Sequence, residues 1–147
     1  MKIIGNLQVE GENSLIKLNS DFSINREYSG YYVEDFVGEE VTFGKLLYYN
    51  IDTSRWHISD NVLFHTLACQ GIALNDATTE QACRILKFGT LRNDNWWFTS
   101  NVLYVGENGD VTTDIPTQFG SFVQAVGTVV GENIAFFDFN TTIIENA

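Results

Sequence analysis

Three side chains of the types used in hydrolytic triads lie close together at His57, Ser59 and Asp60. In a triad, a nucleophile, a base and an orienting acid converge on one point, and they normally come from distant positions in the chain. Neighbouring side chains on an extended strand point away from one another and cannot converge in this way. We therefore interpret these residues as a polar cluster beside a turn.

Two further groups of residues have types that bind metal ions. His65, Cys69 and Cys83 suit zinc, but a zinc site needs about four ligands and the pattern supplies no fourth. The cysteines lack the dense spacing of a disulfide framework, so we expect both to be reduced and buried. An oxygen-rich set, whose spacing differs from that of an EF-hand, lies in predicted turns and is explained by turn chemistry: Asp94, Asn95, Glu107, Asn108 and Asp110.

Motifs that mark enzymes are absent from the sequence. It contains no Gly-rich phosphate loop, no G-x-S-x-G and no H-E-x-x-H. The 19 acidic residues include many pairs of the kind that glycosidases use, but such a pair has weight only beside a cleft. We therefore expect a protein that is not an enzyme, with no catalytic residue, no cofactor and no metal ion.

The adjacent Trp96 and Trp97 are the strongest candidates for a binding role. On a strand, consecutive residues face opposite sides, so one ring is expected in the core and the other at the surface. Because Trp dominates interface energetics, we expect the outward ring to anchor a neighbouring subunit, together with Phe122 and Val126 on nearby strands. The alternatives are a partly covered surface residue and a sugar-stacking platform, which requires convergent polar groups beside the ring.

The stretch from Trp96 to Phe139 has the pattern of consecutive antiparallel strands, because runs of β-branched and aromatic residues alternate with turn residues. Asn108–Gly109 predicts a tight hairpin turn after residues 102–105. A second hairpin is expected to join residues 122–130 to 134–139. Several of these strands are apolar on both faces, which favours a protein that works through contact with other subunits.

A strand-turn-strand pattern occurs twice, in residues of about 39–75 and 95–131. Leu47 matches Leu103, and the central glycines of the long strands match at the same spacing of 56 residues, which favours an internal duplication. We expect two duplicated meanders that form a small antiparallel barrel or sandwich. Between them, the sequence favours a turn followed by a strand over a short helix.

Residues 1–38 lie outside the repeated pattern and are expected to form an extended N-terminal arm, followed by a single β domain at residues 39–147. The arm has short apolar patches that suit strand addition to the edge of a partner sheet. Its candidate docking residues are Ile3, Ile4, Leu7 and Leu15. The competing interpretation makes residues 15–18 a strand of the barrel itself.

Length and composition agree with one ordered β domain. The chain has 147 residues, of which 44% are hydrophobic and 14% aromatic, with a single Pro, and this composition argues against disorder. A net charge of -11 with eight Lys and Arg argues against nucleic acid and anionic membranes as partners. We expect a soluble protein, because no apolar run has the length of a secretory signal or a membrane span.

Several glycine- and aromatic-rich stretches resemble a β-rich domain of tailed-bacteriophage virion proteins, found in head decoration proteins, head fibres and some tail fibres. The resemblance covers roughly residues 36–145. The stretches that carry it are Phe36–Tyr48, Gly71–Ala77, Phe88–Leu91, Val102–Val105 with Gly109–Thr112, and Val123–Gly127. These positions mark a fold and carry no chemistry of their own.

The resemblance implies a virion structural protein that binds the capsid surface as an oligomer, either as a decoration (cement) protein or as a head fibre. The implied partners are the major capsid protein and two further copies of the chain in a homotrimer, assembled in the host cytoplasm. The first alternative is a tail-fibre or baseplate component that contacts a receptor or glycan. A small polysaccharide hydrolase is the third interpretation. A chain that ends directly after its β domain favours decoration over a fibre.

Overall fold

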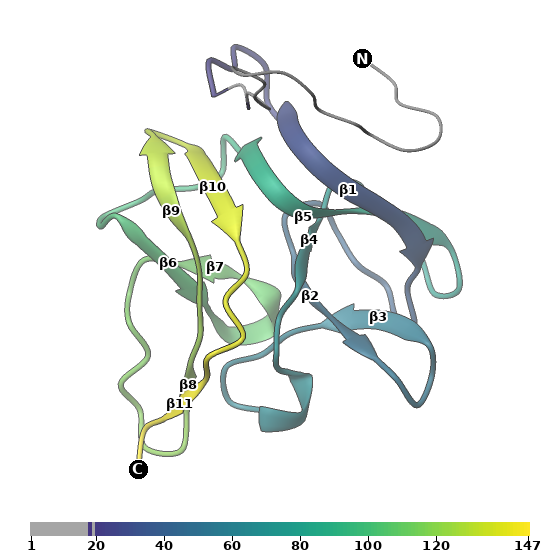
Figure 1. Ribbon diagram of the computed structural model, residues 1–147, viewed down its shortest axis with the longest axis vertical. Coiled ribbons are helices and arrows are strands. Elements are labelled where there is room, and N and C mark those ends of the chain that lie inside the picture. Colours follow the sequence, from purple (N-terminus) through teal and green to yellow (C-terminus); the bar gives the residue numbers. More distant parts are fainter. Residues whose placement is uncertain (1–17, 19) are drawn as a thin grey trace, which may run out of the picture.

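The computed structural model describes residue 18 and residues 20–147, which form an almost entirely β structure (Figure 1). In this part of the chain, two 3₁₀ turns accompany the strands, η1 (Phe64–Thr66) and η2 (Glu107–Gly109), and α-helix is absent. The strands are β1 (Tyr28–Phe36), β2 (Leu46–Asn50), β3 (Arg55–Ile58), β4 (Gly71–Ala73), β5 (Ala82–Arg92), β6 (Val102–Val105), β7 (Val111–Thr112), β8 (Phe122–Val123), β9 (Ala125–Gly131), β10 (Ile134–Asp138) and β11 (Ile144–Glu145). The expected all-β class is confirmed.

Nine strands form one antiparallel sheet, curled into a half-barrel, with the order β3-β2-β4-β5-β10-β9-β6-β7 (Figure 1). β1 lies along one edge of β5, while β4 and β10 follow one another along its other edge. A separate pair joins β8 to β11. The two ends of the curled sheet meet through loops, because the Asn61 N–H donates to the Gly106 carbonyl at 3.2 Å and Lys45 pairs with Asp110 at 2.6 Å.

Two three-stranded units lie on either side of the contact between β5 and β10. The first unit contains β2, β3 and β4, and the second contains β6, β7 and β9. Leu47 pairs with Gly71 in the first unit, and Leu103 pairs with Gly127 in the second, 56 residues further along in both cases. The two units therefore share their strand pairing in the same register. Their origin by duplication stays a prediction.

Buried side chains form two cores, one on each face of the sheet. The inner core fills the concave side and consists of Leu46, Cys69, Ile72, Leu74, Leu86, Leu91, Leu103, Val105, Val126, Ala135 and Phe137. The outer core lies on the convex side of the first unit and consists of Val37, Val41, Leu47, Trp56, Ala73, Ala77, Cys83 and Ile85. Neighbouring residues on one strand, such as Ile85 and Leu86, thus reach different cores, which explains strands that are apolar on both faces.

β1 corrects the sequence interpretation of the N-terminal segment. Residues 28–36, assigned there to an arm, pair with β5 over the whole length of β1. The preceding turn is also attached, because Phe22 is buried and its carbonyl accepts a hydrogen bond from Arg92 Nη1 at 2.7 Å. The arm prediction is wrong for these residues, since their strand partner lies far along the chain and leaves no local pattern. The candidate docking residues Ile3, Ile4, Leu7 and Leu15 lie outside the described residues.

The local turn predictions agree with the structure. Asn108 and Gly109 have φ angles of 51° and 74° in the turn between β6 and β7, as the Asn-Gly pattern requires. β9 and β10 form the second expected hairpin, but residues 122–123, which were expected to belong to it, form β8 and pair with β11. β5 is the strand that the sequence favoured over a helix after residue 75.

β1 and β5 approach most closely where two glycines face each other. Gly30 pairs with Gly89, and their φ angles are 148° and 145°. A Cβ atom on Gly89 would overlap the carbonyl oxygen of Ser29, so the two backbones have no room for a side chain there. This contact fixes how β1 lies on the sheet.

We predict that Gly89→Ala lowers the free energy of unfolding by at least about 2 kcal/mol, because steric overlap adds to the cost of an unfavourable φ angle. Gly120→Ala is the matched control. Gly120 also has a positive φ of 81° but has no atom within 4 Å of an added Cβ, so its loss is expected near 1 kcal/mol. Urea unfolding measures both values, and equal losses would contradict the close contact between β1 and β5.

Candidate functional site

The three triad-like residues form contacts that join turns. His57 Nδ1 lies 3.0 Å from Glu39 Oε2, and Asp60 accepts hydrogen bonds from the backbone N–H groups of Val62 and Asn108. Ser59 is fully buried. His57 and Asp60 therefore bind separate partners, and the three side chains do not converge on a common point.

The two thiols lie in different cores. Cys69 belongs to the inner core and Cys83 to the outer core, so the sheet separates them and confirms the prediction that they are buried and unpaired. His65 is exposed on η1. Among the described residues, no three His, Cys, Asp or Glu side chains lie close enough together to hold a metal ion.

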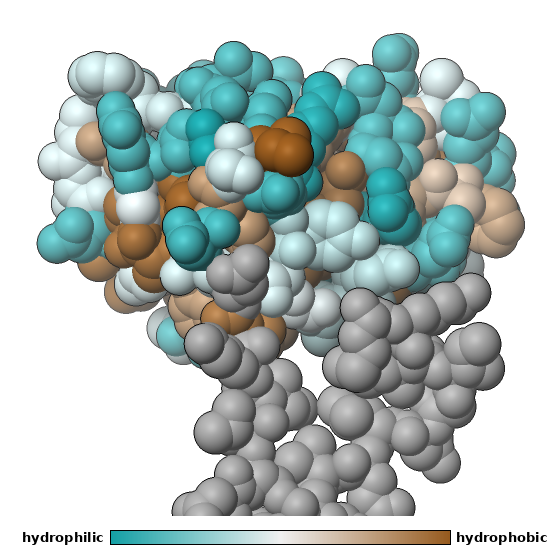
Figure 2. Space-filling model, turned by 90° about the horizontal axis from the view of Figure 1, so that it is seen from above, coloured by the Kyte–Doolittle hydropathy of each residue, from teal (hydrophilic) through white to brown (hydrophobic). Residues whose placement is uncertain are grey.

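An uncovered region of the sheet is a candidate contact surface. Residues that pair across neighbouring strands lie on the same face of the sheet. Tyr31 pairs with Phe88. Phe136 pairs with Thr128, which pairs in turn with Val102. Phe88 and Phe136 pack edge to face with ring centroids 5.1 Å apart. We call the convex surface over β1, β5, β10, β9 and β6 the outer face, formed by Tyr31, Phe88, Val102, Thr128, Val130 and Phe136. Seen from above, hydrophobic side chains gather among hydrophilic ones on the side of β9 and β10 (Figure 2).

The shared register of the two units shows that the outer face is unusual. Val102 and Thr128 of the second unit correspond to Leu46 and Ile72 of the first. Leu46 and Ile72 are 0% exposed in the inner core, where they pack against the second unit, whereas Val102 is 37% exposed. The same face is thus covered in one unit and open in the other.

The predicted interface residues Phe122 and Val126 occupy different environments. Val126 is 0% exposed in the inner core, so its assignment to a subunit interface is wrong: it is the extra residue at the register shift between β6 and β9, and the shift turns it inward. Phe122 is partly exposed and packs against Phe64 with ring centroids 5.3 Å apart. Leu63, Phe64 and Ile144 are exposed around it at the end of the molecule that carries β8 and β11.

Trp96 and Trp97 lie in the loop between β5 and β6, and not on a strand as the sequence analysis assumed. The predicted arrangement of one inward and one outward ring nevertheless holds. Trp96 packs against the inner core through Phe98 and Phe137, with ring centroids 5.3 and 5.8 Å apart. Trp97 is 84% exposed.

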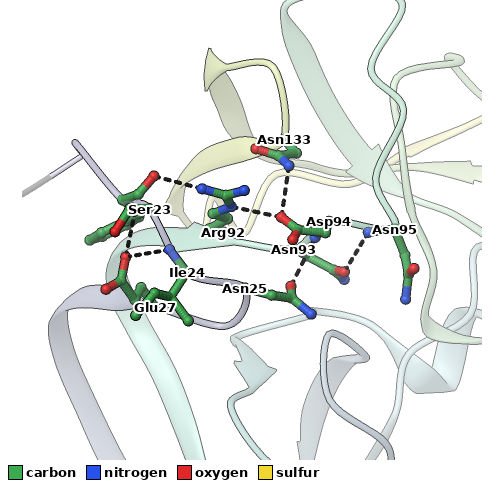
Figure 3. A network of polar contacts seen from close by, with 10 residues as sticks. Ser23, Ile24, Asn25, Glu27, Arg92, Asn93, Asp94, Asn95 and Asn133 are labelled. Carbon is green, nitrogen blue, oxygen red and sulfur yellow. Dashed lines mark hydrogen bonds and ion pairs between the residues drawn. The ribbon is translucent and has the colours of Figure 1, made fainter.

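A network of polar contacts fixes the start of the Trp96–Trp97 loop (Figure 3). Asp94 Oδ1 accepts hydrogen bonds from Arg92 Nε at 2.6 Å and from Asn133 Nδ2 at 2.8 Å. The Asp94 N–H donates to Asn25 Oδ1 at 2.9 Å, which ties the loop to the segment before β1. The Trp96 N–H then donates to the carbonyl of the buried Asn93 at 3.0 Å. The backbone is thus held before Trp97, and Phe98, which packs against the inner core, holds it on the other side.

A groove of about 410 Å³ lies between this loop and the residues after η2. Its lining combines aromatic rings with amide, hydroxyl and charged groups: Phe43, Gly44, Lys45, Asn93, Asn95, Trp96, Trp97, Phe98, Thr99, Asp110, Val111, Thr112, Thr113 and Asp114. A second hollow of about 540 Å³ shares β7, Asp110 and Asp114 with it. The two together follow β7, the last strand of the sheet. We call the first hollow the Trp97 groove.

No protein-family model, no curated protein and no solved structure matches this chain. No helix in the described part of the chain is long and apolar enough to cross a membrane. Sequence reasoning missed the outer face. No local sequence pattern marks this face, because Tyr31 and Phe88 are distant in the sequence and meet only through the pairing of β1 with β5. The polar lining of the Trp97 groove likewise comes from three separate segments.

We predict that only one of the two tryptophans contributes to stability. Trp96→Ala should lower the free energy of unfolding by about 3 kcal/mol, since it removes a ring packed on the inner core. Trp97→Ala should change it by less than about 0.5 kcal/mol, because the ring is 84% exposed. Urea unfolding followed by circular dichroism measures both, and a comparable loss for Trp97→Ala would contradict its exposed position.

We also predict that both thiols resist modification in the folded protein. Burial raises the pKa of Cys69 from 9.0 to about 12, and burial raises the pKa of Cys83 to about 11. Reaction with a thiol reagent at pH 8 should be at least about 100-fold slower than in urea. Burial favours the neutral thiol in the folded state, so the stability that the two buried thiols contribute is fully present below pH 9. It is lost as the pH rises toward 12, because the thiols then ionise. Rapid labelling of the native protein would contradict the buried positions.

Proposed function

We propose that this protein is a non-enzymatic virion structural protein that decorates a phage capsid as a homotrimer, with the outer face in contact with a second copy of the chain. The observation that carries the proposal is the open outer face with its aromatic cluster. Monomeric proteins rarely leave a large continuous apolar surface exposed, and such surfaces commonly mark contacts between proteins. The resemblance to phage virion domains supplies the setting.

The architecture favours another copy of this chain as the occupant. In the first unit, the corresponding face is covered by the second unit through the inner core. On this proposal, a unit from a neighbouring copy covers the open face of the second unit in a similar way. Copies that each carry -11 repel one another, so their contact requires a largely uncharged centre. The six named outer-face residues are uncharged, and the exposed Asp138, which pairs with Phe88, adds one acidic group to the same face.

Attachment to the major capsid protein completes the proposal. The residues proposed for docking are Ile3, Ile4, Leu7 and Leu15, which are suited to strand addition. The exposed end of the molecule around Phe64 is the second candidate for docking, because Leu63 and Phe64 are both exposed there. Attachment to heads by a variant that lacks residues 1–17 would favour that end, whereas loss of attachment would favour the N-terminal residues. On this proposal, the protein resides on the capsid surface.

A tail-fibre or baseplate component with receptor contact is the second candidate function. Trp97 favours it, since an exposed ring beside a polar groove suits ligand binding. Both candidates use the outer face for assembly and differ in what the remaining surface contacts. Labelled protein imaged on particles would place it on the head or on the tail.

We predict that the wild-type protein elutes as a trimer of its 16.6 kDa chain in light scattering coupled to size exclusion. Tyr31→Glu and Val130→Glu each place a charge on the outer face, on β1 and on β9. Each should raise the dissociation constant of the trimer by about tenfold or more. Ile51→Glu is the control, because Ile51 is 81% exposed in the turn between β2 and β3 and lies outside this face.

The folded state of each variant is checked by thermal unfolding. Unchanged assembly of Tyr31→Glu and Val130→Glu would refute the outer face as the contact. A wild-type protein that remains monomeric at micromolar concentration and decorates particles as a monomer would refute the oligomer.

A further inference from the structure

We propose that the Trp97 groove binds a neutral, hydroxyl-rich polysaccharide, with the Trp97 ring as the stacking platform. This site is separate from the outer face, and its failure would leave the proposed assembly unaffected. Four observations support it: the exposure of the ring, the rigidity of its loop, the polar groups beside it and the charge of the groove.

The exposure of Trp97 departs from the pattern that the two units share. The Ala73 N–H donates to the Lys45 carbonyl in the first unit, and the Val129 N–H donates to the Asn101 carbonyl in the second, both at 2.9 Å. Val41 lies four residues before Lys45, and Trp97 lies four residues before Asn101, so the two occupy equivalent positions in the two units. Val41 is 1% exposed, whereas Trp97 is 84% exposed. A core position in one unit has become a surface aromatic in the other, so the ring serves no packing role within the described chain.

The loop presents the ring in a fixed position. Trp96 and Phe98, the two neighbours of Trp97, pack against the inner core, and the Asp94 network fixes the chain just before them (Figure 3). A rigid platform loses little conformational entropy when a ligand binds. The apolar C–H face of a sugar ring can stack on an indole and bury area there, while its hydroxyl groups remain at the edges of the ring.

Polar groups converge beside the ring, as a sugar site requires. The side chains of Asn95 and Asp114 both line the groove and make no hydrogen bond to another described residue. Asn95 offers two donors and an acceptor, and Asp114 offers acceptors, which together match the donor and acceptor character of hydroxyl groups. Thr99 and Thr113 bond to each other at 2.9 Å and keep further capacity as acceptors.

The charge of the Trp97 groove and the length of the combined hollows indicate which class of polysaccharide fits. Lys45 is neutralised by Asp110 at 2.6 Å, so Asp114 leaves the groove with a net negative charge that disfavours nucleic acid and acidic polysaccharides. The adjoining hollow, which shares Asp110, β7 and Asp114 with the groove, extends the lining beyond the space of one sugar ring. A neutral polysaccharide chain of several residues therefore fits better than a free monosaccharide.

The test uses the full chain and a panel of neutral polysaccharides: dextran, mannan, galactan, β-glucan and chitin oligosaccharides. Alginate serves as the acidic comparison. The chain has three Trp, and Trp97 is the exposed one, so ligand stacking should shift its fluorescence to shorter wavelength. Calorimetry then gives the dissociation constants. We expect at least one neutral member to bind at millimolar concentration or tighter, and alginate to bind at least about threefold more weakly.

Trp97→Ala should weaken polysaccharide binding by about tenfold or more, whereas Trp97→Phe should retain part of the affinity. Asn95→Ala should weaken binding by about threefold or more. Ile51→Ala, which removes another highly exposed apolar side chain, should leave it within about twofold. Absence of binding by every member of the panel would overturn the proposal. So would binding that Trp97→Ala leaves unchanged, or a trimer that Trp97→Ala dissociates, which would make Trp97 a subunit anchor instead.

Discussion

The structure depends on the pairing of β5 with three other strands. β5 bonds to β1 along one edge, and to β4 and then β10 along the other. The register with β1 shifts between Tyr31 and Tyr32, which leaves Lys87 as an extra residue on β5. Such a bulge bends a strand and increases its twist. The bend allows one strand to serve both three-stranded units, and the curled sheet can then enclose the inner core.

The two units are built alike but are covered differently, and the candidate functional surfaces occur where they differ. The first unit is buried on both faces, by the inner core and by the outer core. The second unit shares the inner core but leaves its convex face open. A position that is Val41 in the first unit is an exposed Trp97 in the second. Residues that depart from a shared structural pattern without a packing reason are candidates for function.

Local sequence patterns predicted the local structure correctly. The Asn108–Gly109 turn, the hairpin of β9 and β10 and the strand after residue 75 follow from turn chemistry and residue type, which act over a few neighbours. The sequence also predicted that the Trp96 and Trp97 rings point in opposite directions, one inward and one outward. It did not predict that both residues lie in a loop.

Local sequence patterns did not predict the features that depend on contacts between distant segments. The pairing of β1 with β5 joins residues that are 46 to 63 positions apart (Phe36 with Ala82, Tyr28 with Leu91), and nothing near Tyr28–Phe36 marks its partner. Val126 was placed on the wrong face for a related reason. Both faces of β9 are partly apolar, so alternation could not show which of them faces the core. The Trp97 groove draws its lining from three segments that the fold brings together.

The positions of the two proposed contact surfaces make them compatible in one assembly. The loop that carries Trp97 packs against the inner core through Trp96, whereas the outer face is on the opposite side of the same sheet. A copy held through its outer face would thus keep its Trp97 groove accessible. An open groove gives a single copy only modest affinity for a sugar chain, because few hydrogen bonds there are shielded from water. Several copies fixed on one particle would raise the effective affinity by avidity, provided that one chain, or neighbouring chains on a cell surface, can reach more than one groove. Assembly through the outer face would therefore convert weak individual contacts into stable attachment without any change in the groove itself.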